Sequence, residues 1–466
     1  MENYRLESDL LGELQVPINA YYGVQTQRAI DNFKISNHKL SHYKEFVRAL
    51  GIVKLGAAKA NFKLGLLNED LYKAIEFACN ELILGNFVKE FPVDMIQGGA
   101  GTSVNMNANE VIANIALEFL GKEKGSYTFC SPNDHVNLSQ STNDAYPTAL
   151  KLALFEMNKQ LIVALEKLYF AFDKKGEEFK DLIKMGRTQL QDAVPMTLGQ
   201  EFEGFSISLK KEIQALRRVS LSFLEINMGA TAIGTGLNAV KGYAELCTNE
   251  IAEISNEPVV LAENLVEATS DTSAFVDYSS SLKKLSIKLS KICNDLRLLS
   301  SGPRAGLFEI NLPPKQPGSS IMPGKVNPVI PEVVNQVCFK VIGNDLTVSF
   351  AAEAGQLQLN VMEPIIGFSI MESIQYLTNA MNSLRKECID GITANADHLK
   401  REVQNSIGIV TALNPHIGYK ASTRIAKQAL ETGESVYQLV LDEKLLSKEQ
   451  LDDILDPKHM VGPAEV

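Results

Sequence analysis

The chain has 466 residues, a formal net charge of −11 and an ordinary share of hydrophobic residues. This length exceeds one typical domain, and the hydrophobic content is enough for large buried cores. The acidic balance, without clusters of Lys and Arg, argues against a nucleic-acid partner. No stretch of about 18 apolar residues predicts a membrane span.

The six cysteines are scattered along the chain, with no CxxC pair and no histidine at metal-ligand spacing. We therefore expect reduced, buried thiols and no built-in metal site. Residues 1–5 show neither the basic nor the apolar segment of a signal peptide. These features predict a cytoplasmic protein.

Residues 1–140 are expected to form a mainly helical N-terminal domain. Apolar spacing predicts helices over 41–62 and 69–84. The glycine- and hydroxyl-rich segment 97–107 precedes a third helix over 109–120, where free N–H groups would make an anion site. The glycine spacing is wrong for a dinucleotide fingerprint, and the Gly-x-Gly at Gly234 lacks the third glycine of that motif.

Residues 141–395 are expected to form a central bundle of very long helices, with almost no strands. Apolar residues recur there every three or four positions. The predicted helices span 145–178, 197–224, 275–299, 329–354 and 363–385. The helix over 329–354 is apolar nearly all round, so we expect it to be buried on all sides. Rods of this length favour a bundle that continues across a symmetric interface, although a monomeric bundle stays open.

Residues 396–466 are expected to form a small, polar, helical C-terminal domain. Ser447 and Gln450 have the spacing of a capping box and predict the start of a helix that reaches Ile454. Segment 414–418 contains Asn, Pro and Gly and predicts a turn between helices. The whole chain is therefore predicted to be all-α with three domains.

Segment 318–327 has a composition that packing does not explain. It contains two glycines, adjacent serines, a proline, Lys325 and Asn327. The prolines over 313–317 disfavour a helix before it, and a long apolar helix follows it. Polar loops held on a rigid scaffold are where chemistry commonly lies.

Three further segments near helix ends are rich in hydroxyl and amide groups, namely 101–103, 139–144 and 186–192. Each alone could cap a helix, because Ser, Thr, Asn and Asp are the preferred capping residues. Their recurrence favours another interpretation. Small hydroxyl and amide groups can surround a carboxylate, and one lysine can supply the net attraction.

These segments resemble the fumarase/aspartase superfamily over nearly the whole chain. The matching motifs are GSSIMPGKVNP, YYGVQTQRAIDNF, GGAGTSVNMN, NDHVN followed by QSTNDAYPT, and GRTQLQDAVPMTLGQEF. The resemblance implies an all-α homotetramer with a central helical bundle. It also implies active sites that each gather loops from three subunits, and elimination reactions that give fumarate.

Two branches of the superfamily compete as interpretations. Fumarases usually carry His where this chain has Gln189, and His-Pro-Asn-Asp where it has Ser131 at the first position. The resemblance is therefore to the aspartase branch, which implies L-aspartate as substrate and fumarate and ammonia as products. The alternatives are a class II fumarate hydratase, acting on malate and fumarate, and a non-catalytic structural relative. No cofactor is required on this interpretation, and activation by a divalent cation such as Mg²⁺ stays open.

The resemblance also implies roles for individual residues. Ser319 is implied to be the base that takes the C3 proton as an alkoxide, activated by loop N–H groups and Lys325. The implied hydrogen-bond donors to the β-carboxylate are Thr102, Ser141, Thr142 and Ser320. The implied ligands of the α-carboxylate are Lys325, Asn327 and Thr188, and Asn143 is implied to face the amino group. Further candidates are Ser103, Gln189, Arg28 and Glu332, and no metal ligands are expected.

Overall fold

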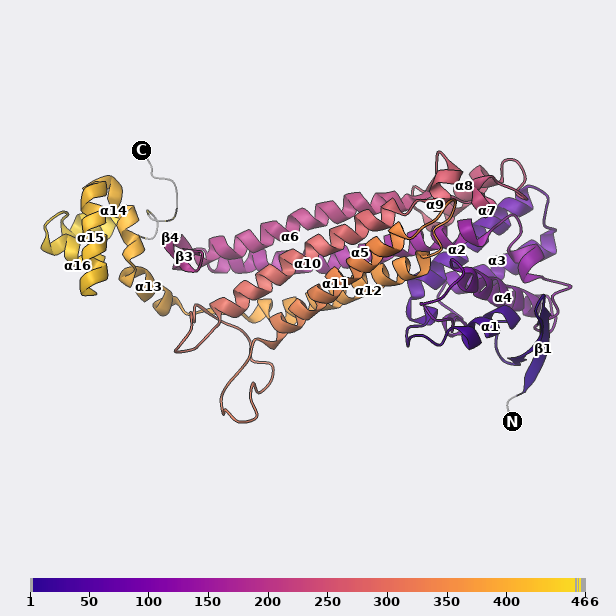
Figure 1. Ribbon diagram of the computed structural model, residues 1–466, viewed down its shortest axis with the longest axis horizontal. Helices are drawn as coiled ribbons and strands as arrows, with labels where there is room; N and C mark the ends of the chain where they lie inside the picture. Colours follow the sequence, from indigo (N-terminus) through magenta and orange to yellow (C-terminus); the bar gives the residue numbers. More distant parts are fainter. Residues whose placement is uncertain (1–2, 457–458, 460, 462–466) are drawn as a thin grey trace. The chain divides into compact units, whose positions relative to one another are not determined.

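The computed structural model describes residues 3–456, 459 and 461, and most of them lie in helices (Figure 1). The predicted all-α class is confirmed. The chain divides into two compact units. Unit 1 comprises Met1–Ile162, Gln214–Ser286 and Phe339–Leu377, and unit 2 comprises Val163–Ile213, Ile287–Cys338 and Thr378–Val466. The division into three sequential domains stays a prediction.

Unit 1 begins with a hairpin of β1 (Tyr4–Asp9) and β2 (Gly12–Pro17), followed by the first four helices. These are α1 (Val24–Asn32), α2 (Lys44–Lys63), α3 (Glu69–Ile83) and α4 (Thr102–Phe119). Two glycines let other helices approach α2 closely. A Cβ at Gly51 would lie 3.1 Å from the Cys79 oxygen in α3, and one at Gly56 would lie 2.6 Å from Ile251 in α8 (Tyr243–Ser255).

Helices α2 and α3 confirm their predictions within a few residues, whereas α4 begins seven positions before the predicted start at 109. The extra turn follows from Gly101, which has φ 90° and turns the chain into the helix at Thr102. A sequence pattern dominated by hydroxyl and amide residues concealed this first turn, because such residues favour caps and loops.

Five long helices confirm the predicted rods. They are α5 (Thr142–Glu178), α6 (Leu198–Ser220), α10 (Ser273–Leu299), α11 (Val329–Glu353) and α12 (Glu363–Glu387). Within unit 1, the Tyr278 hydroxyl of α10 donates to Asn158 Oδ1 of α5 at 2.8 Å. In α12, a Cβ at Gly367 would lie 2.7 Å from Leu150 of α5. Within unit 2, Phe172 of α5 packs against Phe202 of α6.

The prediction that the helix over 329–354 is buried on all sides is wrong for the single chain. Phe339, Leu346 and Phe350 of α11 are 61%, 57% and 67% exposed. Steps of seven and four residues place all three on one face of the helix. Within the described part of unit 1, this apolar face of α11 remains exposed.

Unit 2 contains a hairpin that the sequence did not predict. Strands β3 (Ile183–Thr188) and β4 (Gln191–Thr197) pair antiparallel between α5 and α6. The two connecting residues, Gln189 and Leu190, both have positive φ, at 55° and 62°. A tight hairpin turn of this kind normally carries Asn-Gly, so the usual sequence signal is absent here.

The remaining short elements complete the two units. In unit 1 they are β5 (Glu225–Ile226), α7 (Thr231–Gly234), β6 (Val260–Leu261) and α9 (Leu265–Ser270). In unit 2 they are β7 (Ile310–Asn311) and β8 (Thr393–Ala394), which pair antiparallel. No helix in the described part of the chain is both long and apolar enough to cross a membrane.

The C-terminal helices gather around an apolar cluster that includes Leu413, Ile425 and Leu451. They are α13 (Ala396–Asn405), α14 (Val410–Ile417), α15 (Tyr419–Thr432), α16 (Val436–Asp442) and α17 (Lys448–Ile454). The predicted capping box at α17 is confirmed, because Ser447 Oγ accepts the Gln450 N–H.

The predicted turn over 414–418 is wrong for most of its length. Residues 414–417 form the last turn of α14, which Pro415 does not break. The Gly418 N–H donates to the Asn414 carbonyl at 2.9 Å and closes that turn, so the change of direction comes only at Gly418, with φ 79°.

Candidate functional site

The segment that precedes α5 is anchored to α2 by side-chain hydrogen bonds. Asn61 of α2 donates its Nδ2 to the Leu138 carbonyl at 2.9 Å and accepts from Ser139 Oγ at 2.9 Å. Ser139 itself has φ 61°, a conformation that a non-glycine residue adopts only with support from its surroundings. The backbone that enters Ser141, Thr142 and Asn143 is therefore fixed before the helix begins.

Asp144 joins this segment to a second one. The buried carboxylate accepts the Ser141 N–H at 3.0 Å and the Gly229 N–H at 3.0 Å. Burial raises the pKa of Asp144 to about 7, and the backbone donors act in the opposite direction. The bonds from both sides fix the loop around Gly229 against the start of α5.

Asn143 is oriented by that same loop. Its Nδ2 donates to the Ala232 carbonyl at 2.7 Å, and its backbone carbonyl accepts from Asn227 Nδ2 at 3.0 Å. Ala232 has φ 61° and ψ −84°, so the carbonyl is presented by a strained turn. This bond uses one of the two amide protons of Asn143, and its amide oxygen is an acceptor.

The loop around Gly229 is not among the segments predicted from the sequence. Gly234 does not fit a dinucleotide motif, yet the run of Gly, Thr and Ala over 229–236 is another small-residue loop next to a helix. That composition is the same signal that identified the other loops, and it could have found this one.

Thr102 and Ser103 form the first turn of α4. Thr102 is exposed, and its hydroxyl donates to the Gly99 carbonyl at 2.8 Å. A Cβ at Gly101 would lie 2.3 Å from the ring of Tyr146 in α5, so only glycine lets the starts of α4 and α5 meet. The structure thus brings Thr102 and Ser103 together with Ser141, Thr142 and Asn143. Some N–H groups of these first turns are already used, since the Thr102 N–H donates to the Gly99 carbonyl at 3.0 Å and the Asn143 N–H to Ser141 Oγ at 3.2 Å.

Arg28, another candidate in unit 1, is engaged elsewhere in this structure. Its guanidinium donates two bonds of 2.8 Å to the Asp9 carboxylate and one of 2.8 Å to the Gly12 carbonyl. The hydrogen bond from Arg28 lowers the pKa of Asp9. The contacts of Arg28 therefore fix the turn of the β1–β2 hairpin.

The candidates in unit 2 lie on a hairpin and a loop. Thr188 ends β3, Gln189 forms the turn, and both side chains are exposed. The hairpin is held by buried ion pairs, because Glu309 pairs with Lys184, at 2.5 Å, and with Arg187. Glu332 lies in the first turn of α11 and is half-buried.

The loop over 312–328 is closed at its base by three hydrogen bonds. The Gly318 N–H donates to the Lys325 carbonyl at 2.7 Å, Asn327 Nδ2 donates to the Gly318 carbonyl at 2.8 Å, and Val329 N donates to the Asn327 carbonyl at 2.9 Å. A Cβ at Gly318 would lie 2.6 Å from the Lys325 carbonyl oxygen, so this position needs glycine. Ser320 and Lys325 are exposed on the loop.

Ser319 has a distinctive environment within this loop. Its Oγ accepts the N–H groups of Ile321 at 3.2 Å and Met322 at 3.0 Å. Two fixed donors on one hydroxyl oxygen stabilise negative charge on that oxygen, because hydrogen bonds to an ionised acceptor are the stronger ones.

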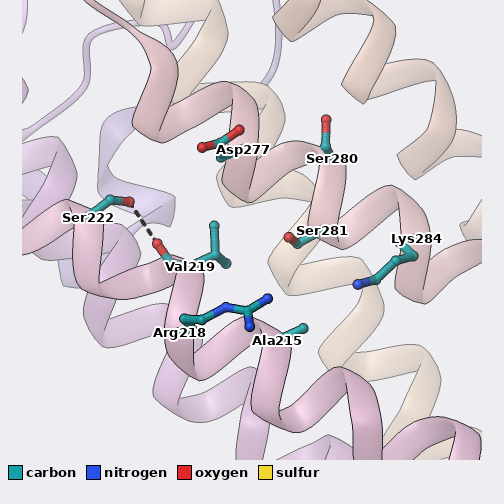
Figure 2. Close-up of a pocket in the computed structure, with 8 residues that line it drawn as sticks. All are labelled: Ala215, Arg218, Val219, Ser222, Asp277, Ser280, Ser281 and Lys284. Atoms are coloured by element: carbon teal, nitrogen blue, oxygen red, sulfur yellow. Dashed lines mark hydrogen bonds between the residues drawn. The ribbon is translucent and has the colours of Figure 1, made fainter.

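A polar groove in unit 1 has none of these candidates among its lining residues (Figure 2). It has a volume of about 570 Å³ and lies between α6 and α10. Its charged lining residues are Arg218, Asp277 and Lys284. Among the described residues, no group of three or more His, Cys, Asp and Glu side chains is placed to hold a metal ion.

Comparison with known proteins identifies the family. A protein-family model described as Lyase matches residues 12–343, and one described as Fumarase C C-terminus matches residues 409–462. The chain belongs to the fumarase/aspartase superfamily of lyases. The loops over 101–103, 139–144, 186–192 and 318–327 all lie within the first of these matches.

The similar curated relatives include proteins named aspartate ammonia-lyase. The one from Pseudomonas aeruginosa is 60% identical over 460 residues, covering 98% of this chain and 97% of its own. Those from Escherichia coli and Helicobacter pylori are 57% and 56% identical, covering 99% and 98% of this chain and 97% and 98% of their own.

Solved structures share the fold over almost the full length. A fumarate lyase:delta crystallin from Brucella melitensis, bound to cobalt, has a TM-score of 0.97 and 53% identity, covering 99% of this chain and 100% of its own. A class II fumarase from Schistosoma mansoni has a TM-score of 0.93 at 35% identity, with the same coverage of both chains.

Proposed function

We propose that this protein is an aspartate ammonia-lyase, which converts L-aspartate reversibly into fumarate and ammonia. The observation that carries the proposal is the set of relatives with that name, which are 56–60% identical over at least 98% of the chain. The residue geometry adds a mechanism that fits the reaction.

The first step requires a base for the C3 proton of aspartate. Ser319 is the proposed base, and its Oγ already accepts two backbone N–H groups. A serine hydroxyl is a weak base unless its alkoxide is stabilised, and fixed amide donors supply that stabilisation. Lys325 in the same loop adds positive charge beside the anionic substrate.

Loss of the proton places a second negative charge on the β-carboxylate as an enediolate. The proposed donors to this group are Thr102, Ser141, Thr142 and Ser320. Hydroxyl donors bind the enediolate more strongly than the ground-state carboxylate, so they lower the barrier rather than only tightening binding. Lys325, Asn327 and Thr188 are proposed to hold the α-carboxylate.

The amine is then expelled as ammonia, and its proposed partner is Asn143. Because one N–H of Asn143 Nδ2 is bonded to the Ala232 carbonyl, its Oδ1 is the proposed acceptor for the amino group. An acceptor suits an ammonium group, which only donates. Gln189, Ser103, Glu332 and Arg28 are proposed to border the site without a defined role.

The proposed catalytic groups come from both compact units, and we propose that they meet in a homotetramer whose active sites are each shared by three subunits. The exposed face of α11 formed by Phe339, Leu346 and Phe350 supports this assembly. Exposed apolar residues aligned on one helix face commonly mark a protein–protein interface.

We also propose that the enzyme works in the cytoplasm and needs no organic cofactor. The six cysteines are unpaired and buried, which fits a reducing compartment. A divalent cation such as Mg²⁺ is proposed only as an activator. Titrating activity with Mg²⁺ and with a chelator tests that point directly.

A class II fumarate hydratase is the second candidate, because the Schistosoma mansoni fumarase shares the fold at a TM-score of 0.93. Its lower identity, 35%, places it behind the aspartate ammonia-lyases. The position where fumarases carry a second-site histidine is Ser131 here. Its hydroxyl caps a local turn by accepting the Asp134 N–H at 3.1 Å.

The deciding experiment is an ultraviolet assay for fumarate, run with L-aspartate and L-malate side by side. We expect fumarate from aspartate alone. Ser319→Ala should lower kcat about 100- to 10,000-fold, the usual contribution of a general base. Ser222→Ala, at a surface serine on the α6 side of the polar groove, is the matched control and should keep full activity. Fumarate from malate alone would replace this proposal with the hydratase, and no fumarate from either would favour a non-catalytic relative.

A further inference from the structure

Lys54 is a completely buried lysine in the middle of α2. Its Nζ donates to three amide oxygens, Asn105 Oδ1 at 2.6 Å, Gln140 Oε1 at 2.9 Å and Asn137 Oδ1 at 3.1 Å. Burying an ammonium group is costly unless each of its protons finds an acceptor, and here all three do. The three amide oxygens together satisfy the hydrogen-bonding capacity of a charged Lys54 side chain.

The charge determines the orientation of Asn105. An ammonium group can only donate, so the oxygen of the Asn105 amide must face Lys54. The amide nitrogen then points to the other side, where it donates to Thr142 Oγ1 at 3.1 Å and to Asn137 Oδ1 at 3.1 Å. A flipped amide would place an N–H₂ group against the ammonium.

The same logic fixes the hydroxyl of Thr142. A hydroxyl has one proton, and the Thr142 oxygen already accepts from Asn105. Its own proton is therefore directed away from Asn105. Thr142 is half-buried in the first turn of α5, next to Ser141 and Asn143.

The other charged and titratable groups near Lys54 are not its direct hydrogen-bond partners. The Asp144 carboxylate is bonded to the backbone N–H groups of Ser141 and Gly229. Burial lowers the pKa of Lys54 to about 7, and the nearby Asp144 carboxylate acts in the opposite direction. The ammonium group contacts three side-chain amides directly. Of these three, Asn105 is the one that also donates a hydrogen bond to Thr142.

We propose that Lys54 is a positioning residue that acts through Asn105 to fix the Thr142 hydroxyl as a donor to a substrate carboxylate. This inference rests on the proposed function, since Thr142 is one of the groups placed against the β-carboxylate. The chain of aligned hydrogen bonds also polarises the hydroxyl, because each bond strengthens the next in a low-dielectric interior. The site thereby gains positive character without a cation in contact with substrate.

Asn105→Asp reverses the direction of the hydrogen bond between residue 105 and Thr142. The carboxylate still accepts from Lys54, but it cannot donate, so the Thr142 proton turns inward to the new acceptor. The matched control is Asn109→Asp, one turn along α4. Asn109 also donates to Asn137 Oδ1, at 3.1 Å, and its bonds do not include Thr142. Both variants add one buried carboxylate to the same cluster.

We expect Asn105→Asp to lower kcat/KM for L-aspartate about 10- to 100-fold relative to Asn109→Asp, the loss of one hydrogen bond to a charged group. Combining it with Thr142→Val should cause no further loss beyond Thr142→Val alone, because both act on one donor. Melting temperature and oligomeric state, measured for each variant, separate this effect from damage to folding. If Asn105→Asp does not fold, Asn105→Ser removes the same donor without adding charge and is expected to give the same non-additive loss.

Equal losses in the two Asp variants, or additive losses with Thr142→Val, would overturn the inference. The proposed function fails separately, and visibly, if the unaltered protein makes no fumarate from aspartate. If the protein is active but Thr142→Val keeps full kcat/KM, Thr142 does not bind substrate and the relay has no role.

Discussion

Glu363, the first residue of α12, is only 4% exposed, and burial raises its pKa from 4.5 to about 8, against an opposing effect of Lys151. The carboxyl is therefore protonated in the folded protein over a pH range where it is ionised in the unfolded chain. The folded state binds the extra proton between pH 4.5 and about 8, so stability falls as the pH rises through this window.

Glu363→Gln removes this dependence. At about 1.4 kcal/mol per pH unit, the contribution of the native Glu363 carboxyl to the free energy of unfolding falls by about 2 kcal/mol by pH 6 and by about 5 kcal/mol once the pH is above 8. The free energy of unfolding of the variant, relative to that of the native protein, should therefore rise by about 3 kcal/mol between pH 6 and pH 9. Lys151 is retained in both proteins, and its own change of charge is an additional effect that Lys151→Met measures.

The assay is urea denaturation of both proteins at pH 6 and pH 9, at one fixed protein concentration. The control is Glu387→Gln, because a hydrogen bond from Lys315 lowers the pKa of Glu387 and its contribution is constant above pH 6. A stability difference for Glu363→Gln that stays constant or shrinks as the pH rises would refute the reasoning.

Three further predictions concern assembly, the loop and the hairpin. Leu346→Glu places a charge on the exposed face of α11 and should abolish the proposed tetramer and the activity together, measured by light scattering and fumarate production. Gly318→Ala introduces a Cβ 2.6 Å from the Lys325 carbonyl oxygen and should lower kcat at least about 10-fold, whereas Gly204→Ala, with open space around its Cβ, should not. Leu190→Gly relieves a positive φ of 62° at an exposed side chain and should raise stability by about 0.5–1 kcal/mol, measured by urea denaturation.

The long helices were predictable because each carries an apolar pattern sustained over six turns or more. The apolar seam of α10 is buried in the structure at each of its positions, Phe275, Tyr278, Leu282, Leu285, Leu289, Ile292, Leu296 and Leu299. A signal repeated this often outweighs local propensities. The same pattern overstated the burial of α11, because a sequence records that a face will be covered but not by which chain.

The hairpin and the first turn of α4 were not predictable by the same reasoning. Gln189 and Leu190 adopt a turn that their residue types do not favour, and tertiary ion pairs to Glu309 support the hairpin. The helix at Thr102 starts from a glycine whose conformation depends on contact with Tyr146. In both cases the local structure depends on residues distant in the sequence.

The candidate residues were found from composition, whereas their orientations required coordinates. A loop rich in Ser, Thr and Asn indicates hydrogen-bonding capacity, but not which atom donates. The two N–H groups on Ser319 and the amide orientation of Asn143 follow from backbone conformations that no single residue type specifies. Lys54 was passed over because it lies within an apolar helical pattern and has no unusual neighbour in the sequence.

The six buried thiols give the chain an internal reporter of its own opening. Burial raises the pKa of every one of them, so the reactive thiolate is scarce in the folded protein. The cysteines lie in both compact units, at Cys79, Cys130, Cys247, Cys293, Cys338 and Cys388, and four of them belong to the helices α3, α8, α10 and α11. A thiol reagent added to the native enzyme therefore labels each position only as fast as the surrounding structure opens. Mass spectrometry of the labelled peptides would rank the parts of the fold by their local stability, with no engineered probe.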